Sequence, residues 1–190
     1  MKLIIGISGA SGVIYSLKLL EEIKKLDQIE THLVITQAAK KTIKTEGFKL
    51  NKITALSNYY YDNNNFTTPI TSGSYKTDGM IIIPCSMKTI AGIASGFSDN
   101  LLLRAADVIL KEGRKLILVP RETPLNPIHL ENMLKLAKIG VTILAAMPAF
   151  YHQPKTIDDL ASYIVSKVLD LLKIEHNNLY ERWNNLIPEK

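Results

Sequence analysis

Residues 6–12, with the sequence GISGASG, form the segment of this chain best suited to hold a phosphate. They interrupt an apolar β-branched run and precede a helical pattern that begins at Val13. Glycines let main-chain N–H groups approach a phosphate, Ser8 and Ser11 add hydroxyl donors, and a helix N-terminus carries about half a positive charge. The segment lacks both the lysine of a P-loop and the G-x-G-x-x-G spacing, so a tight turn of small residues is the alternative. We predict that it binds an anionic nucleotide or a flavin phosphate.

A second group of polar residues follows the apolar run 80–84. Ser86 and Thr89 stand at the start of a helix of small residues, where hydroxyls and main-chain N–H groups could hold the other end of the same ligand or a second ligand. The alternative is an ordinary helix N-cap. Cys85 has no histidine near it in the sequence that could activate it, so we expect it to pack as a small apolar residue.

Charged side chains on either side of the apolar run 116–120 could bind an anion. Arg104 and Lys111 stand seven residues apart on one face of a predicted helix, with Asp107 between them, a pattern also typical of a solvated charged stripe. The pair Arg121–Glu122 directly follows the run, where a parallel strand delivers side chains to a ligand crevice. An arginine fork suits phosphate, and a glutamate can act as an acid or a base.

The loop 148–154, PAFYHQP, presents aromatic side chains between two prolines. Tyr151 could donate a hydrogen bond to phosphate and also line an apolar pocket. His152 could serve as a general base, although a loop histidine without an identified partner is more often polar surface.

Composition favours a globular protein with a small anionic ligand. The 190 residues are 46% hydrophobic, and 23 Lys and Arg against 18 Asp and Glu are spread along the chain, which indicates an anionic small substrate and no nucleic-acid partner. One cysteine excludes an internal disulfide and a cysteine-rich zinc site, and no carboxylate cluster suggests Mg²⁺, so we predict no metal site. No apolar run approaches the length of a membrane span and no signal peptide is evident, so we expect a cytoplasmic protein that does not bind membranes.

Strand-like and helical patterns alternate along the chain, which predicts an α/β fold: a doubly wound, open parallel, Rossmann-like sheet with helices on both faces. Its ligand site should lie at the carboxyl ends of the strands. Residues 56–78 show neither period and are expected to be an exposed excursion. We predict one domain over 1–174 and a tail over 175–190 that docks on a neighbouring subunit through Trp183. The strands are expected at 3–8, 31–36, 79–84, 115–120 and 141–145, and the helices at 13–26, 38–46, 89–94, 100–111, 128–138 and 157–172.

Five segments, in order along nearly the whole chain, together resemble the UbiX flavin prenyltransferases, members of the flavoprotein fold group that includes flavin-dependent cysteine decarboxylases. The resemblance implies an enzyme that joins the dimethylallyl group of dimethylallyl monophosphate to N5 and C6 of reduced FMN without a metal. Its product, prenylated FMN, would serve UbiD-type decarboxylases, and the implied assembly is a homo-dodecamer with shared sites. The segments are GISGASG at 6–12, PCSMKTIAGIASG at 84–96, the run 99–125 ending in VPRETPL, HLENMLKLAKIG at 129–140 and PAFYHQP at 148–154.

The same resemblance assigns roles to individual residues. The prenyl phosphate would meet Tyr151 and Lys167, with Lys111, Arg121 and Glu122 nearby and Arg104 reaching in from a neighbouring subunit. Relatives often carry serine at Thr36 and arginine at Lys167, and lysine lacks the planar fork of arginine. Catalytic roles are implied for Ser11, Glu46, Lys111, Arg121 and Glu122, and FMN contacts for Gly9, Ala10, Ser11, Thr36, Ser86, Met87, Lys88, Thr89 and Arg121.

These residues suit the implied chemistry. Fixed Arg and Lys donors in a dry pocket can neutralise a departing phosphate, and an aromatic pocket can shelter an allylic cation. Glu122 and the released phosphate would then handle protons. Two alternatives are a cysteine decarboxylase of the same fold, whose catalytic histidine is absent from residues 37–48, and a non-catalytic FMN-binding subunit. A carrier would not need Arg121, Glu122, Tyr151 and Lys167 together.

Overall fold

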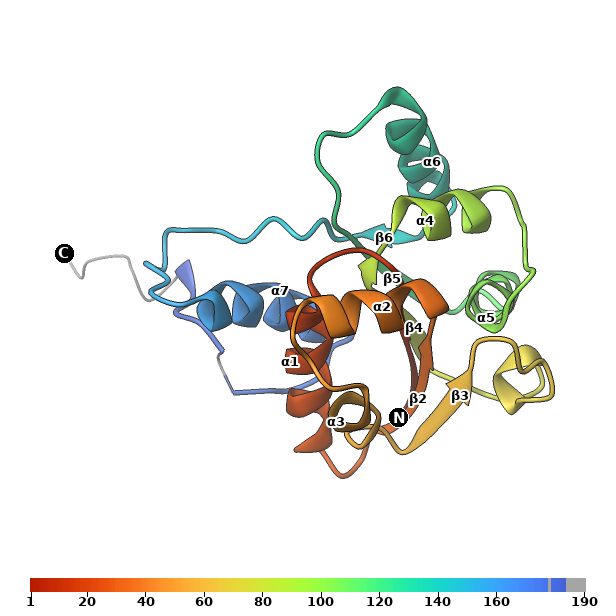
Figure 1. Cartoon of the computed structure of the whole chain (residues 1–190), viewed down its shortest axis with the longest axis horizontal. Coiled ribbons are helices and arrows are strands. Elements are labelled where there is room, and N and C mark those ends of the chain that lie inside the picture. The colour runs from red at the N-terminus through yellow and green to blue at the C-terminus, as the bar shows by residue number, and fades with distance from the viewer. Residues whose placement is uncertain (178, 184–190) are drawn as a thin grey trace.

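A six-stranded parallel sheet forms the centre of the computed structural model, which describes residues 1–177 and 179–183 (Figure 1). The strand order is β3-β2-β1-β4-β5-β6. Strands β1 to β3 are therefore added towards one edge of the sheet and strands β4 to β6 towards the other, and the switch point lies between β1 and β4. Such a switch point leaves a crevice at the carboxyl ends of the two strands. The strands are β1 (Lys2–Ile7), β2 (Glu30–Ile35), β3 (Tyr59–Asp62), β4 (Gly79–Cys85), β5 (Lys115–Pro120) and β6 (Thr142–Ile143).

Helices cover both faces of the sheet, as predicted (Figure 1). β1 and β4 are buried on both faces, and this explains their continuous apolar sequence. One apolar core lies under α1, α2, α3 and α7, and the other lies under α4, α5 and α6. The helices are α1 (Val13–Lys24), α2 (Gln37–Thr45), α3 (Leu50–Thr54), the 3₁₀ turn η1 (Pro69–Thr71), α4 (Met87–Ala94), α5 (Leu101–Lys111), α6 (Pro127–Lys138) and α7 (Ile157–Leu171).

The interpretation of residues 56–78 as an exposed excursion is wrong in part. Residues 59–62 form β3, an edge strand parallel to β2, and Asn63 is buried. The sequence showed no alternation here because the side chains of β3 are mostly exposed and it is only four residues long. The rings of Tyr59 and Tyr61 instead stack on the buried His32 of β2, at 5.0 and 5.8 Å between centroids.

Two other elements differ from the sequence expectations. The short helix α3 was not predicted, and β6 has only two residues where a five-residue strand was expected. After β6 the chain runs as a long connection to the N-terminus of α7, away from the sheet (Figure 1). Over the described residues, no helix is long and apolar enough to cross a membrane.

The described part of the tail packs on α7 of its own chain. Arg182 makes a two-pronged ion pair with Asp170, at 3.1 and 2.7 Å, and Tyr180 is 8% exposed. Trp183 is 59% exposed and its ring centroid lies 5.1 Å from that of Tyr151. Residues 178 and 184–190 of the predicted docking tail lie outside the described residues.

Candidate functional site

Ser8 joins the two loops that meet at the switch point of the sheet. Its hydroxyl donates to the carbonyl of Pro84 at 3.1 Å and accepts from the N–H of Ser86 at 2.7 Å. Ser8 is buried, so both bonds are shielded from water. The glycine-serine loop after β1 and the start of α4 are therefore held together as one edge, as the two polar motifs predicted.

A cavity of about 180 Å³ lies between this edge and α2. Thr36 caps α2 by accepting from the N–H of Ala39 at 3.1 Å, and Ser86 caps α4 by accepting from the N–H of Thr89 at 3.4 Å. Both hydroxyls thus act as the N-caps considered in the sequence, yet they also face the cavity. The first N–H groups of each helix have no intrahelical acceptor, so two positive helix ends converge here. The lining residues are Gly9, Thr36, Gln37, Ala38, Asn63, Ser86, Lys88, Thr89, Asn100, Leu102 and Leu103.

Close approach between the first loop and α2 requires Gly9. A Cβ atom at this position would lie 2.6 Å from the Cβ of Ala38. Any larger residue would push the loop away from the N-terminus of α2 and open the cavity. The glycine is therefore required by packing, in addition to any contact with a ligand.

The N-terminus of α1 is occupied by a carboxylate of the protein itself. Glu46 accepts from the N–H of Gly12 at 2.8 Å and from the N–H of Val13 at 2.9 Å. Because those two donors and the local positive field are already used, the phosphate predicted for the first loop would have to meet residues 9–11 and not the helix end itself. Ser11, one residue earlier, is exposed. The available helix ends are those of α2 and α4.

Arg121 connects the end of β5 to the first loop. Its Nε donates to the carbonyl of Ser11 at 3.0 Å, while its main-chain N–H donates to Cys85 at 3.3 Å. Tyr15 lies close enough for the positive charge of Arg121 to lower the pKa of its phenol, although burial raises that pKa more strongly. Glu122 is exposed and accepts from the N–H of Thr123 at 3.0 Å. Ser11, Arg121 and Glu122 therefore share this edge, as predicted.

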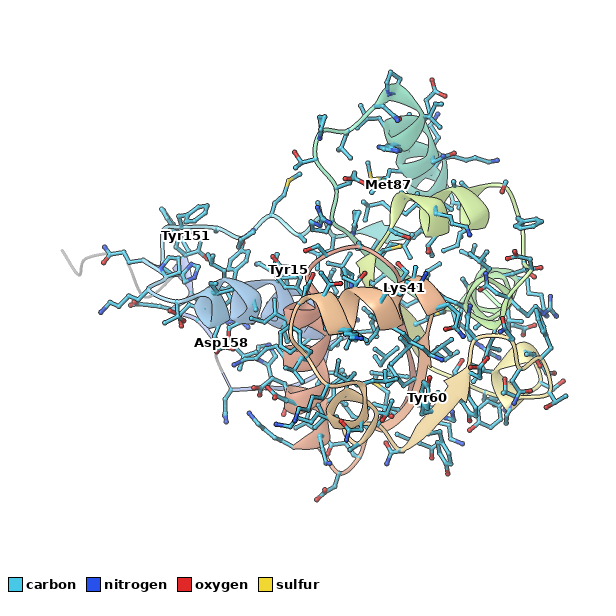
Figure 2. The ribbon with its side chains drawn as sticks, viewed as in Figure 1. Tyr15, Lys41, Tyr60, Met87, Tyr151 and Asp158 are labelled. Atoms are coloured by element: carbon cyan, nitrogen blue, oxygen red, sulfur yellow. The ribbon has the colours of Figure 1, made fainter. Side chains whose placement is uncertain are left out.

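Tyr151 lies next to α7, away from Met87 of α4 (Figure 2), and Lys167 is a residue of α7. Both contact Tyr163, whose ring centroid lies 6.4 Å from that of Tyr151 and 5.7 Å from Nζ of Lys167. Burial, followed by hydrogen bonding to Tyr180, raises the pKa of Tyr151, and the charge of Lys167 opposes the rise. His152 packs in the same cluster, but its ring nitrogens are buried without a hydrogen-bond partner among the described residues. Nothing described orients it as a general base.

Arg104 and Lys111 lie on a different part of the surface from Arg121. Arg104 donates to the carbonyl of Thr71 at 3.2 Å and to Asp107 at 2.8 Å, and Lys111 pairs with Glu112. They line a hollow with residues 71–74, and Lys111 ends α5 next to the amino-terminal end of β5. Within one chain, Lys111 is therefore not beside Arg121 and Glu122, which corrects that expectation.

Asn63 and Asn100 are site residues that the sequence analysis missed. Asn63 accepts from the N–H of Leu102 at 3.0 Å through its side chain, and Asn100 accepts from the N–H of Leu103 at 3.1 Å. Together they cap α5 beside the cavity. Asn100 directly before an apolar helix was a readable N-cap signal, whereas Asn63 could not be found without knowing that β3 ends there.

Cys85 is fully buried, and burial raises the pKa of its thiol far above the usual range. This agrees with the prediction that it packs as an apolar residue. Among the described residues, no group of three or more His, Cys, Asp or Glu is placed to hold a metal ion.

The fold and the switch-point cavity define a Rossmann-like flavoprotein, and the model of the Flavoprotein family matches residues 1–169. The chain is 48% identical over 187 residues to the flavin prenyltransferase UbiX of Methanocaldococcus jannaschii, covering 98% of this chain and 100% of that one. The chain belongs to the UbiX flavin prenyltransferase family.

Two solved structures agree with this membership. A dodecameric FMN-dependent UbiX-like decarboxylase from Escherichia coli O157:H7 is 49% identical, with a TM-score of 0.94 over 96% of this chain and 99% of that chain. AnUbiX (PadA1), solved with FMN and dimethylallyl pyrophosphate, is 43% identical, with a TM-score of 0.93 over 96% of this chain and 97% of that chain.

Proposed function

We propose that this flavin prenyltransferase binds reduced FMN in the cavity between α2 and α4 and prenylates it with dimethylallyl monophosphate. The observation that carries the proposal is the convergence of two helix N-termini at the switch point, where Ser8 fixes the loops after β1 and β4. The first N–H groups of α2 and α4 and the hydroxyls of Thr36, Ser86 and Thr89 suit the FMN phosphate. Ala10, Met87 and Lys88 flank these contacts.

Bound FMN supplies the nucleophilic N5 and C6 atoms that accept the dimethylallyl group. The chain's own residues would control the leaving phosphate. Arg121 is held by Ser11 at the carboxyl edge of the sheet, so its fork would be preorganised to neutralise charge as the carbon–oxygen bond breaks. Glu122 extends from the same strand end and would accept or return a proton. Glu46 fixes the loop that carries Ser11.

Subunit association would complete the site. Arg104 and Lys111 line one hollow that does not meet Arg121 within a chain, so we propose that a neighbouring subunit supplies both. The related Escherichia coli protein is dodecameric, which supports a homo-oligomer here. Tyr151 and Lys167 would bind the prenyl phosphate, and the tail would extend the contact between subunits.

The product, prenylated FMN, would pass to a UbiD-type decarboxylase. We place this activity in the cytoplasm, since the single cysteine is a buried free thiol, as is usual for proteins of a reducing compartment.

The direct experiment is anaerobic incubation of the full-length protein with reduced FMN and dimethylallyl monophosphate, followed by mass spectrometry of the flavin. We expect the mass of FMN to increase by one dimethylallyl group. Unmodified FMN after complete reduction, with FMN still bound, would favour the non-catalytic binding subunit.

A charge variant tests the location of the flavin. Ser11→Asp places a negative charge in the first loop and should weaken FMN binding, measured by fluorescence titration. Asn51→Asp adds the same charge on exposed α3 and should leave the affinity unchanged. Equal affinities for both variants would remove the first loop from the FMN site.

A further inference from the structure

The ring of Tyr163 lies at the centre of an aromatic cluster on α7. Its centroid is 5.5 Å from that of His152 with the two planes nearly parallel, 6.4 Å from that of Tyr151 and 4.8 Å from that of Tyr180, both at steep angles. These separations fall within the range of favourable stacked and edge-to-face pairs. We call these four residues the Tyr163 cluster; Tyr151, at the end of the long connection, is labelled in Figure 2.

Tyr163 also lies under Lys167. The two residues are four apart on α7, so their side chains share one face of the helix. Nζ of Lys167 is 5.7 Å from the ring centroid, within the distance at which an ammonium group is attracted by an aromatic face. A lysine stem has many rotamers, and this attraction favours those that keep the charge over the ring.

We propose that Tyr163 is a positioning residue for the prenyl phosphate, which holds Tyr151 and Lys167 in the geometry that binds it. The inference rests on the proposed roles of those two residues. Tyr163 is the one ring in this cluster that contacts both, and it lies on the rigid helix, whereas Tyr151 lies on an irregular connection. The ring therefore restricts the rotamers of Lys167 and holds the loop that carries Tyr151 against α7.

The ring, and not the hydroxyl, carries this role. Among the described residues no hydrogen bond is formed by the Tyr163 hydroxyl, while the contacts with Tyr151, His152 and Lys167 all involve the ring. Phenylalanine should therefore replace Tyr163, whereas an aliphatic residue should not.

The test compares Tyr163→Phe with Tyr163→Leu in the full-length protein. We expect Tyr163→Leu to raise the KM for dimethylallyl monophosphate roughly tenfold, the scale of one lost cation–π and ring contact, with little change in kcat. FMN affinity, measured separately by fluorescence, should stay unchanged, and Tyr163→Phe should restore the wild-type KM. Tyr60→Leu on β3 removes an equally large tyrosine from a remote surface and should have no effect.

A double-mutant cycle distinguishes positioning from general packing. If Tyr163 acts through Lys167, Tyr163→Leu should change KM much less when Lys167→Met is already present. Tyr163→Met, which keeps a long side chain in the helix, replaces the leucine variant if that protein does not fold.

The outcomes separate this inference from the proposed function. An unchanged KM in Tyr163→Leu, or a raised KM in Tyr163→Phe, would overturn the positioning role while the wild-type enzyme still prenylates FMN. Parallel losses of FMN affinity and activity would also overturn it, since they indicate a purely structural residue. A wild-type protein that leaves FMN unmodified would instead overturn the proposed function.

Discussion

Arg121 is the side chain whose removal should most directly affect departure of the phosphate. It is anchored by Ser11 and emerges at the end of β5, so its charge is fixed before substrate binds. Arg121→Ala should lower turnover on the order of a hundredfold, the usual scale for one preorganised donor. Steady-state prenylated-FMN formation measures the effect. Lys138→Ala, at the exposed end of α6, is the charge-matched control, and wild-type kinetics in Arg121→Ala would exclude the assigned role.

A variant of Glu122 should separate FMN binding from proton transfer. Glu122→Gln keeps the shape of the side chain and its acceptor for the N–H of Thr123 but cannot take up a proton as a carboxylate does. We expect FMN binding to persist and prenylated FMN to form slowly, as followed by stopped-flow absorbance and flavin mass. If the product forms at full speed, Glu122 only orients its neighbours, and the released phosphate becomes the leading proton acceptor.

Residue types alone predicted which polar side chains lie at the carboxyl ends of the strands, but they did not predict that Glu46 caps α1. Ser86 and Arg121 were predicted because a polar residue after an apolar strand is visible in the sequence, whereas Thr36 was implied by the family resemblance. Thr36 and Ser86 line the cavity, and Arg121 follows the end of β5. The capping of α1 by Glu46 was not predictable, since it joins residues 34 and 33 positions apart through a tertiary contact. Sequence patterns do not encode such distances.

At the scale of elements, Glu46 should stabilise α1. Its carboxylate satisfies two N–H groups and complements the helix dipole, so Glu46→Gln should lower the free energy of unfolding by about 1 kcal/mol. Urea unfolding of the FMN-free protein isolates this effect from any role in turnover. The control is Glu21→Gln, on the exposed surface of α1, which should change stability much less. Equal stabilities would show that the charge of Glu46 contributes nothing as a cap.

His32 of β2, which packs against the tyrosines of the edge strand β3, should make stability depend on pH. Burial lowers the pKa of His32 below its ordinary value of about 6.5, although the Glu30 hydrogen bond partly opposes the shift. The unfolded chain therefore binds a proton that the folded chain resists, so unfolding free energy should fall as pH drops from about 7.5 through 6.5. The lowered pKa values of Glu30 and Asp62 act only below about 4.5, outside this window.

His32→Phe provides the comparison for this effect. Phenylalanine can still pack against Tyr59 and Tyr61 but cannot be protonated, so the stability of the variant should be flatter between about pH 5.5 and 7.5, the window set by an ordinary histidine. Urea midpoints across this range measure the difference. Parallel curves for the two proteins would assign the pH dependence to other groups.

Helices and strands were predicted correctly where burial gave the sequence a clear apolar pattern, and they were missed where it did not. β1, β4 and α5 were predicted because strands buried on both faces and amphipathic helices have clear sequence patterns. β3 has exposed side chains and was missed, since its pairing with β2 depends on a partner distant in sequence. Asn63 was missed with it.

At the scale of the whole molecule, the proposed site residues of one chain occupy three separate places. Ser11, Arg121 and Glu122 lie at the carboxyl edge, Tyr151 and Lys167 lie on the Tyr163 cluster, and the third place is the hollow of Arg104 and Lys111. Sequence spacing could not show this separation, because helix α5 carries Lys111 from the cavity end of the sheet towards the opposite edge. A site that needs all three places requires more than one subunit.

Mixed oligomers test this requirement. Arg104→Ala and Arg121→Ala should each be nearly inactive alone, because every site then lacks one phosphate donor. When the two chains are coexpressed with different tags and purified through both, some sites combine an intact Arg104 from one subunit with an intact Arg121 from its neighbour. Activity should therefore reappear in the mixed oligomer. The control pairs Ser11→Asp with Arg121→Ala: these residues are in contact within one chain, so no site in the mixture is free of a defect. Recovery in the control, or none in the test pair, would mean that Arg104 and Arg121 do not come from different subunits.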